Sequence, residues 1–86
     1  MSSQDIQNQV NELWAQAKKN RAENRWEDAV NSYSRILKLV PRFVPAYVER
    51  GLLVQEMGYS DMAMGDIENA SQIDPQYGYA YYGRAW

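Results

Sequence analysis

A repeat of 34 residues constrains the fold of this chain more than any other feature. "ILKLVPRF" at residues 36–43 and "ASQIDPQY" at residues 70–77 align with Pro41 and Pro75 34 residues apart. The same offset superimposes further pairs of similar residues: Ala29 on Ala63, Leu39 on Ile73, Phe43 on Tyr77, Ala17 on Gly51, and Val10 on Val44. Applied once more, it places "AYVERG" (46–51) on "AYYGRA" (80–85). A repeat of this length indicates one supersecondary unit copied along the chain.

Apolar residues in the first copy recur at helical spacing. Ile6, Val10, Leu13 and Ala17 follow one another at intervals of four, three and four residues, which places them on one face of a helix. A second run of this kind consists of Trp26, Ala29, Val30, Tyr33, Ile36, Leu37 and Val40. "SSQD" at residues 2–5 resembles a capping box ahead of the first run. Each copy of the repeat is therefore expected to hold two helices.

Helix start and stop signals divide the second copy in the same way. Pro45 lies where the first turn of a helix tolerates a missing N–H, and Gly58 is a residue of the kind found just after a helix. Ser60 is expected to cap the next helix, and Asp74 before Pro75 to end it. The sequence predicts an all-α fold with helices at about 4–23, 26–40, 44–57 and 60–73, and a short one at 78–86.

The repeat resembles the tetratricopeptide repeat (TPR) family, helix-turn-helix units that stack into a right-handed α-solenoid. The matching positions are Tyr47 and Tyr81 in the aromatic slot, with Leu13 in the first repeat; Ala17, Gly51 and Ala85 in the small slot; Gly58 in the turn; Ala29 and Ala63 at the helix crossing; Tyr33 and Ile67 after it; and the terminal Pro41 and Pro75. "YVERG" and "DIENASQIDP" look like the variant common in bacterial and plastid members. Gln16, Asn20 and Asn24 depart from the pattern, the last standing in the slot of the turn glycine.

The resemblance implies a single domain over residues 1–86. Repeat 1 would span about 10–43, repeat 2 about 44–77, and the start of a third repeat 78–86. Two antiparallel helices approach to about 8 to 10 Å only where the side chains at their crossing are small. Gly51 with Ala63 is expected to supply that contact in repeat 2, and Ala17 with Ala29 in repeat 1.

The resemblance also implies a non-catalytic scaffold for protein–protein interaction. In such repeats the first helix of each unit lines a concave groove. The residues expected to face it are Trp14, Lys18, Arg21, Val48, Leu52, Gln55, Tyr82 and Trp86. Rigid aromatic and aliphatic side chains of this kind suit an extended peptide or an amphipathic helix of a partner protein.

Composition argues against catalysis, cofactors and metals. The chain contains no cysteine and no histidine, which excludes thiolate and imidazole chemistry and the usual structural zinc sites. Its carboxylates fit a solvated helical face. The glycines Gly51, Gly58 and Gly65 are spaced seven apart and do not form a phosphate-binding loop. We expect no enzyme, no cofactor and no metal site.

Charge and hydropathy bear on the partners. Residues 1–43 carry a net charge of +2 and residues 44–86 a net charge of −4. Neither value favours nucleic acid, which usually requires a strongly basic face. Residues 1–20 lack the basic start and apolar core of a signal peptide, and no run approaches the ~20 apolar residues that span a bilayer. The expectation is a cytoplasmic protein without membrane contact.

The carboxyl-terminal segment "YGYAYYGRAW" is unusually aromatic. It carries the first-helix pattern of a third repeat without the second helix that would cover it, and exposed aromatic surface often marks an interface. Tyr79, Tyr81, Tyr82 and Trp86 are expected to form such an interface. Two alternatives to peptide binding follow: a self-assembly module that forms homo-oligomers through this helix, or the amino-terminal part of a longer repeat protein.

One ion pair is also expected. Arg50 and Arg84 share one repeat slot, and Asp66 lies on the second helix of repeat 2, whereas the equivalent slots of repeat 1 hold the neutral Gln16 and Ser32. Because the charges occur together or not at all, we expect Asp66 to pair either with Arg50 or with Arg84.

Overall fold

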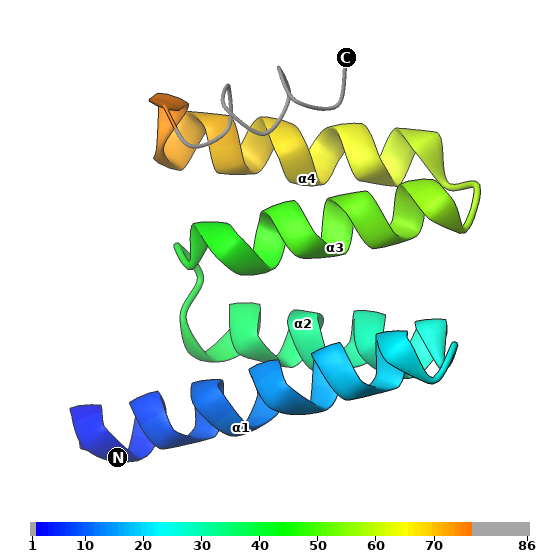
Figure 1. The fold of residues 1–86 in the computed structure, drawn as a ribbon. Helices are drawn as coiled ribbons and strands as arrows, with labels where there is room; N and C mark the ends of the chain where they lie inside the picture. The colour runs from blue at the N-terminus through cyan, green and yellow to red at the C-terminus, as the bar shows by residue number, and fades with distance from the viewer. Residues whose placement is uncertain (1, 77–86) are drawn as a thin grey trace. The chain divides into compact units, whose positions relative to one another are not determined.

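A computed structural model describes residues 2–76 of the chain. Within that range the fold is all-α, with four helices: α1 (Ser3–Ala22), α2 (Trp26–Leu39), α3 (Val44–Glu56) and α4 (Ser60–Ile73) (Figure 1). Their bounds agree with the predicted ranges to within one residue. The helix expected at 78–86 lies outside the described residues.

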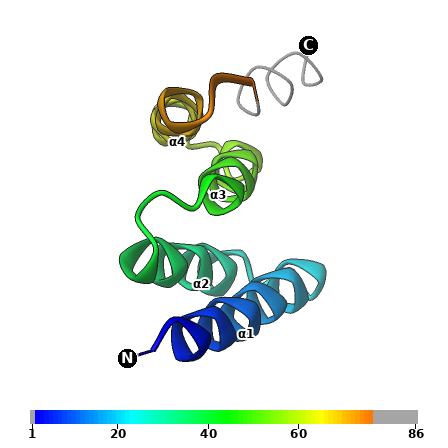
Figure 2. The same ribbon diagram turned by 90° about the vertical axis from the view of Figure 1, so that its left-hand side faces the viewer.

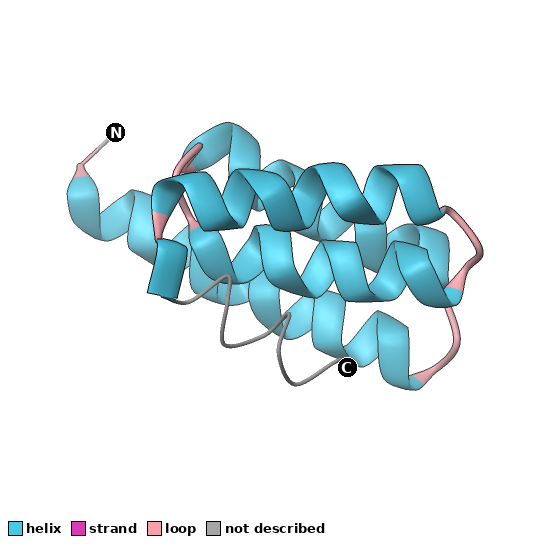
Figure 3. Ribbon diagram, turned by 90° about the horizontal axis from the view of Figure 1, so that it is seen from above, coloured by secondary structure: helices cyan, strands magenta, loops and turns pink. Residues whose placement is uncertain are grey.

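The chain divides into two compact units, Met1–Pro41 and Arg42–Trp86. In the first unit α1 packs against α2, and in the second α3 packs against α4. Each is a pair of antiparallel helices joined by a short turn, as Figures 1 and 2 show from two directions and Figure 3 shows with the loops coloured separately. The helix-turn-helix organisation expected for each copy of the repeat is therefore confirmed.

The turn between α3 and α4 depends on Gly58. This glycine has a φ of +96°, a left-handed conformation that costs other residues energy. Its N–H donates to the carbonyl of Gln55, and the next N–H, that of Tyr59, donates to the carbonyl of Val54 at 2.8 Å. These two bonds make a Schellman motif, which satisfies the last carbonyls of α3.

Asn24 makes the same turn between α1 and α2. Its φ is +63°, and asparagine is one of the few residues that tolerate this region. Its N–H donates to the carbonyl of Arg21, and the N–H of Arg25 donates to the carbonyl of Asn20 at 2.7 Å. Each of these residues stands 34 positions before its counterpart in the second turn. The replacement of glycine by Asn24 therefore changes the residue and preserves the backbone of the repeat.

The second helix of each pair ends in the same conformation. Val40 has φ −134° and ψ 87°, and Asp74 has φ −139° and ψ 91°. Both precede a proline, Pro41 or Pro75, and proline favours extended backbone in the residue before it. The prolines thus end α2 and α4 where the sequence predicts.

The helix starts confirm two expectations and correct a third. The Ser2 hydroxyl accepts a hydrogen bond from the N–H of Asp5 at 3.2 Å, and Pro45 lies in the first turn of α3. Ser60, however, is not the cap of α4: it is the first helical residue, and Tyr59 is the N-cap, without a side-chain hydrogen bond. Because Tyr59 both closes the Schellman turn and begins the next helix, no position is left between them for a serine cap.

Small residues allow the close approach of the helices in each pair. In the first pair Ala17 and Ala29 are fully buried. In the second pair a Cβ added to Gly51 would lie 3.2 Å from Asp66 Cβ, 3.2 Å from Ile67 Cδ1 and 3.4 Å from the carbonyl oxygen of Ala63. The predicted contact of Gly51 with Ala63 is confirmed, and it leaves little room for a side chain on α3.

Candidate functional site

Trp14 is the largest side chain among the residues expected to bind a partner. It lies in the middle of α1 and is half-buried. Its ring meets the ring of Tyr33, on α2, with centroids 5.5 Å apart and planes at 71°, an edge-to-face arrangement that aromatic pairs prefer. Tyr33 is itself fully buried. The buried Tyr33 therefore packs against one edge of the Trp14 indole, while another part of the indole stays at the surface.

Lys18 and Arg21 lie on the same side of α1 as Trp14. The ammonium of Lys18 lies 5.1 Å from the centre of the Trp14 ring, within the range of a cation–π contact. Lys18 is exposed and Arg21 is half-buried. Three of the predicted site residues thus share one face of α1: Lys18 lies beside the Trp14 ring, and Arg21 lies about two turns beyond Trp14 along the helix.

The three residues expected on α3 have different environments. Val48 is fully buried and forms a core cluster with Val44 and Ala70. Leu52 is partly buried and packs against that cluster, and Gln55 is exposed. Val48 therefore belongs to the core of its own helix pair, whereas Leu52 and Gln55 retain surface that a partner can contact.

The remaining predicted site residues, Tyr79, Tyr81, Tyr82 and Trp86, lie outside the described residues. Within the described part, the expected groove draws Trp14, Lys18 and Arg21 from one unit and Leu52 and Gln55 from the other. That these two sets form one continuous surface stays a prediction.

Asp66 pairs with Arg50, one of the two partners expected for it. Arg50 Nη2 lies 2.6 Å from Asp66 Oδ1, and Arg50 Nε lies 2.9 Å from Oδ2. The guanidinium also lies 5.7 Å from the centre of the Tyr47 ring. This ion pair links α3 to α4. Because Arg50 donates to both carboxylate oxygens of Asp66, the pair is a structural contact.

Two cation–π contacts follow from residue spacing and were not among the predictions. Lys18 follows Trp14 by four residues and Arg50 follows Tyr47 by three, and residues at these intervals face each other on a helix. The exposed apolar side chains Tyr59, Met62 and Met64 were also not anticipated; they are 56%, 48% and 55% exposed.

Residues 2–76 were compared with two structural criteria, a cluster of metal ligands and a membrane-spanning helix. Residues 2–76 contain no cluster of three or more carboxylate, histidine or cysteine ligands placed to hold a metal ion. Across the same residues, every helix falls short of the length and apolar character that crossing a bilayer demands.

Comparison with known proteins gives distant similarities. No protein-family model matches the chain. It is 29% identical over 70 residues to small glutamine-rich tetratricopeptide repeat-containing protein 2 of Mycosarcoma maydis, a match that covers 81% of this chain and 20% of that protein. It is 36% and 38% identical over 52 residues to UPF0162 proteins from two strains of Xylella fastidiosa, matches that cover 60% of this chain and 18% of each relative.

The chain thus spans about a fifth of the length of the curated relatives it matches. The similarity to a tetratricopeptide repeat-containing protein and the two helix pairs together fit TPR-like repeats.

Proposed function

We propose that the chain is a TPR domain that binds a peptide or a helix of a partner protein through the first helices of its repeats. Repeat 1 spans about 10–43 and repeat 2 about 44–77, with the start of a third at 78–86. Support for the repeat assignment comes from the shared turn at Asn24 and Gly58 and from the similarity to a tetratricopeptide repeat-containing protein.

The observation that carries the binding role is the position of Trp14. A large aromatic side chain is held on a buried tyrosine and stays half-exposed, so its conformation is set before any partner arrives. Binding then costs little side-chain entropy, which is one reason that tryptophan is enriched among the residues that dominate interfaces. The role is non-catalytic, in keeping with a chain that lacks cysteine and histidine.

The test is a titration of the full chain with a library of fluorescently labelled peptides that contain leucine and phenylalanine, read by fluorescence anisotropy. Replacing Trp14 by alanine should weaken the best binder by about 2 kcal/mol or more, which is about thirtyfold. Gln55→Ala is the comparison within the expected groove: because Gln55 is exposed and neutral, its truncation should leave the affinity nearly unchanged even if a partner touches it. Equal, small losses in both variants would contradict the proposal.

Self-assembly of the chain is a separate hypothesis, and it is tested under the same conditions as the peptide titration. The mass of the chain, measured by sedimentation at several concentrations, shows whether copies associate under the conditions of the titration. If the peptides failed to bind and the mass rose with concentration, the assembly role would replace the binding role.

A further inference from the structure

Gly65 lies in the middle of α4, where no contact of the described residues requires a glycine. It is exposed within the helix, and a Cβ added to it would meet no atom of residues 2–76 within 4 Å. The buried residues Ala63 and Ala70 lie about 140 to 160° from it around the helix axis. The equivalent slot of repeat 1 holds Asn31, which is also exposed. Because glycine inside a helix is less stable than alanine, the glycine carries a cost that this part of the fold does not explain.

The outward side of α4 around Gly65 is uncharged along one edge and acidic along the other. A helix turns by about 100° per residue, which places Met62 and Asn69 about 40 to 60° from Gly65 in one direction. Asp61 and Glu68 lie about 40 to 60° from it in the other direction. All of these side chains are exposed. We call the five residues together the Gly65 face.

The first repeat shows that the helix pair can fold without this pattern. Met62 and Asn69 stand in the slots that Asp28 and Arg35 occupy in repeat 1, and both residues of repeat 1 are exposed. The chain continues after α2 as it does after α4, so its continuation does not by itself account for the exchange of two charged residues for uncharged ones. The Gly65 face therefore has a character that belongs to the second repeat alone.

The charge of the Gly65 face favours a basic partner. Between Gly51 and Gln76 the chain has five carboxylates and no Lys or Arg. Asp61 and Glu68 are seven residues apart, which is about 10 Å along α4, and two cations seven residues apart on a partner helix have the same spacing. A second copy of α4 would bring carboxylates against carboxylates, and such like-charge contacts disfavour association.

We propose that the Gly65 face is a docking site for a basic helix of another protein. The partner helix crosses α4 at Gly65, because helices approach most closely where the side chains at their crossing are small. It sets an apolar side chain on Met62, whose flexible and polarisable thioether adapts to the shape of a partner, and places Lys or Arg beside Asp61 and Glu68. The site lies on the second helix of repeat 2, so it goes beyond the proposed function, which uses the first helices.

The test uses three helical synthetic peptides with the same alanine- and leucine-containing face. They carry lysine, glutamine or glutamate at two positions seven residues apart. Each is fluorescently labelled and titrated with the full chain, and binding is read by anisotropy. The lysine peptide should bind most tightly and the glutamate peptide least, and added salt should weaken binding of the lysine peptide most. Equal affinities for the three peptides would overturn the proposal.

The two exposed methionines of α4 provide a matched pair of variants. Met62 and Met64 are 48% and 55% exposed, and they lie about 160° apart around the helix axis. Met62→Ala should weaken binding of the lysine peptide by about fivefold or more, whereas Met64→Ala should leave it unchanged. Equal effects of the two changes would mean that the peptide does not bind on the Gly65 face.

Gly65→Ala separates docking from folding. Alanine should make α4 more stable, so weaker binding by this variant cannot come from loss of folded protein. The added methyl group at the helix crossing should weaken binding of the lysine peptide by about fivefold or more. An unchanged affinity would show that no partner backbone approaches Gly65, and the proposal would fail.

Two further variants test the role of charge. Glu68→Gln should weaken binding of the lysine peptide by about two- to fivefold, the range for one exposed charge pair, and leave the glutamine peptide unaffected. Glu27→Gln makes the same change of charge at an exposed position of repeat 1 and should change neither affinity. If both variants weakened binding of the lysine peptide equally, only the net charge of the chain would matter, and the proposed site would be wrong.

Two outcomes would assign the binding to another place or another occupant. Trp14→Ala should leave the affinity for the lysine peptide unchanged; a loss in this variant, with none in Met62→Ala, would place the peptide on α1 instead. Sedimentation of the chain alone tests for a second copy. A mass that rose with concentration in the unaltered chain and not in Met62→Ala would make a second copy the occupant and overturn the proposal.

Discussion

Arg50 and Asp66 form a two-point ion pair between α3 and α4, with Nη2 2.6 Å from Oδ1 and Nε 2.9 Å from Oδ2. The side chains are 17% and 5% exposed, so the pair is largely removed from water. In such a site the attraction between the charges must offset the cost of their desolvation, and the loss of one partner leaves the other uncompensated.

Removing the carboxylate alone should therefore be costly. We expect Asp66→Ser to lower the free energy of unfolding by about 3 to 5 kcal/mol. The double variant with Arg50→Gln reproduces the pair Gln16 and Ser32 found at the equivalent slots of the first repeat. It should recover a substantial part of the loss, because no buried charge then lacks a partner. Urea unfolding of the single and double variants measures the coupling; additive losses would contradict it.

Alanine substitutions at Gly51 and Gly65 are expected to have opposite effects on stability. Alanine at Gly65, on an exposed part of α4 with open space around it, should stabilise the protein by about 0.5 to 1 kcal/mol, because alanine restricts the unfolded chain and favours helix. Alanine at Gly51 meets Asp66 Cβ at 3.2 Å, and that residue is fixed by its ion pair. The resulting overpacking should outweigh the helix preference and destabilise the protein by about 1 kcal/mol. Equal melting temperatures for the two variants would show that the contact can relax.

The left-handed turns give a third prediction. Gly58→Ala should lower stability by about 1 kcal/mol through backbone strain alone, since an added Cβ at Gly58 meets no atom within 4 Å. Asn24→Ala should cost a similar amount, and Asn24→Gly much less, because glycine adopts the same φ freely. Thermal unfolding followed by circular dichroism provides the measurement. A harmless Gly58→Ala would mean that the turn does not require a positive φ.

The order of the helices and their ends could be predicted because they depend on local signals. Pro41 and Pro75 restrict the residue before them whatever packs nearby, and Gly58 is a strong stop signal. The sequence pattern did not reveal that Tyr59 serves two helices at once, so it placed the cap of α4 one residue too late. The offset also located the turn at Asn24 without showing that its backbone is left-handed.

The candidate site was predicted less completely than the fold. Spacing by three and four residues identifies the direction in which a helical side chain points, and on α1 it correctly grouped Trp14 with Lys18. It does not determine how wide the buried sector of a helix is. On α3 that sector extends to Val48, which packs with Val44 and Ala70, although its slot is the one that Trp14 occupies at the surface of α1.

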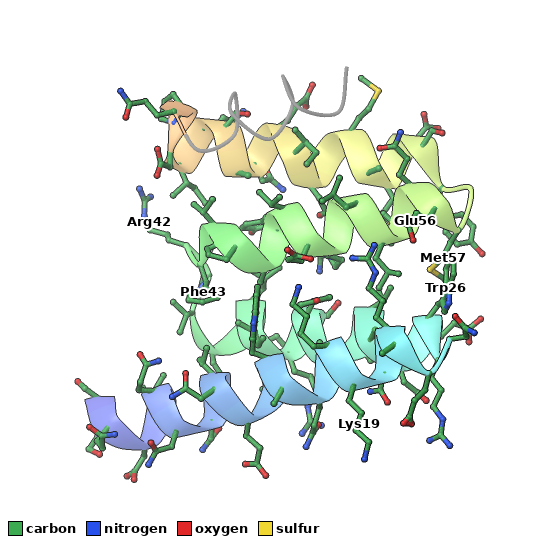
Figure 4. All side chains as sticks on the ribbon, viewed as in Figure 1. Lys19, Trp26, Arg42, Phe43, Glu56 and Met57 are labelled. Atoms are coloured by element: carbon green, nitrogen blue, oxygen red, sulfur yellow. The ribbon has the colours of Figure 1, made fainter. Side chains whose placement is uncertain are left out.

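The second unit, Arg42–Trp86, carries its net negative charge at the surface. Arg42 and Phe43 lie at the start of α3, and Glu56 and Met57 lie at its other end (Figure 4). Between Gly51 and Gln76 the chain has five carboxylates and no Lys or Arg. The one carboxylate of this stretch that is buried, Asp66, is neutralised by Arg50, so the remaining negative charge belongs to the surface.

Trp14 should matter to stability as well as to binding, and the two roles can be separated. Trp14→Ala removes the half-buried indole and its edge-to-face contact with Tyr33, and should lower the free energy of unfolding by about 2 kcal/mol. Trp14→Phe keeps an aromatic ring against Tyr33 and should cost about 1 kcal/mol or less.

Because Trp14→Phe should leave the protein nearly as stable as before, a change in its affinity for peptide can be assigned to the altered binding surface and not to loss of folded protein. Urea unfolding of both variants, with Gln55→Ala as an exposed control, gives the comparison. If phenylalanine were as damaging as alanine, the contact with Tyr33 would depend on the indole itself. If neither variant lost stability, Trp14 would contribute to the surface alone, and the alanine variant could be used directly in the peptide titrations.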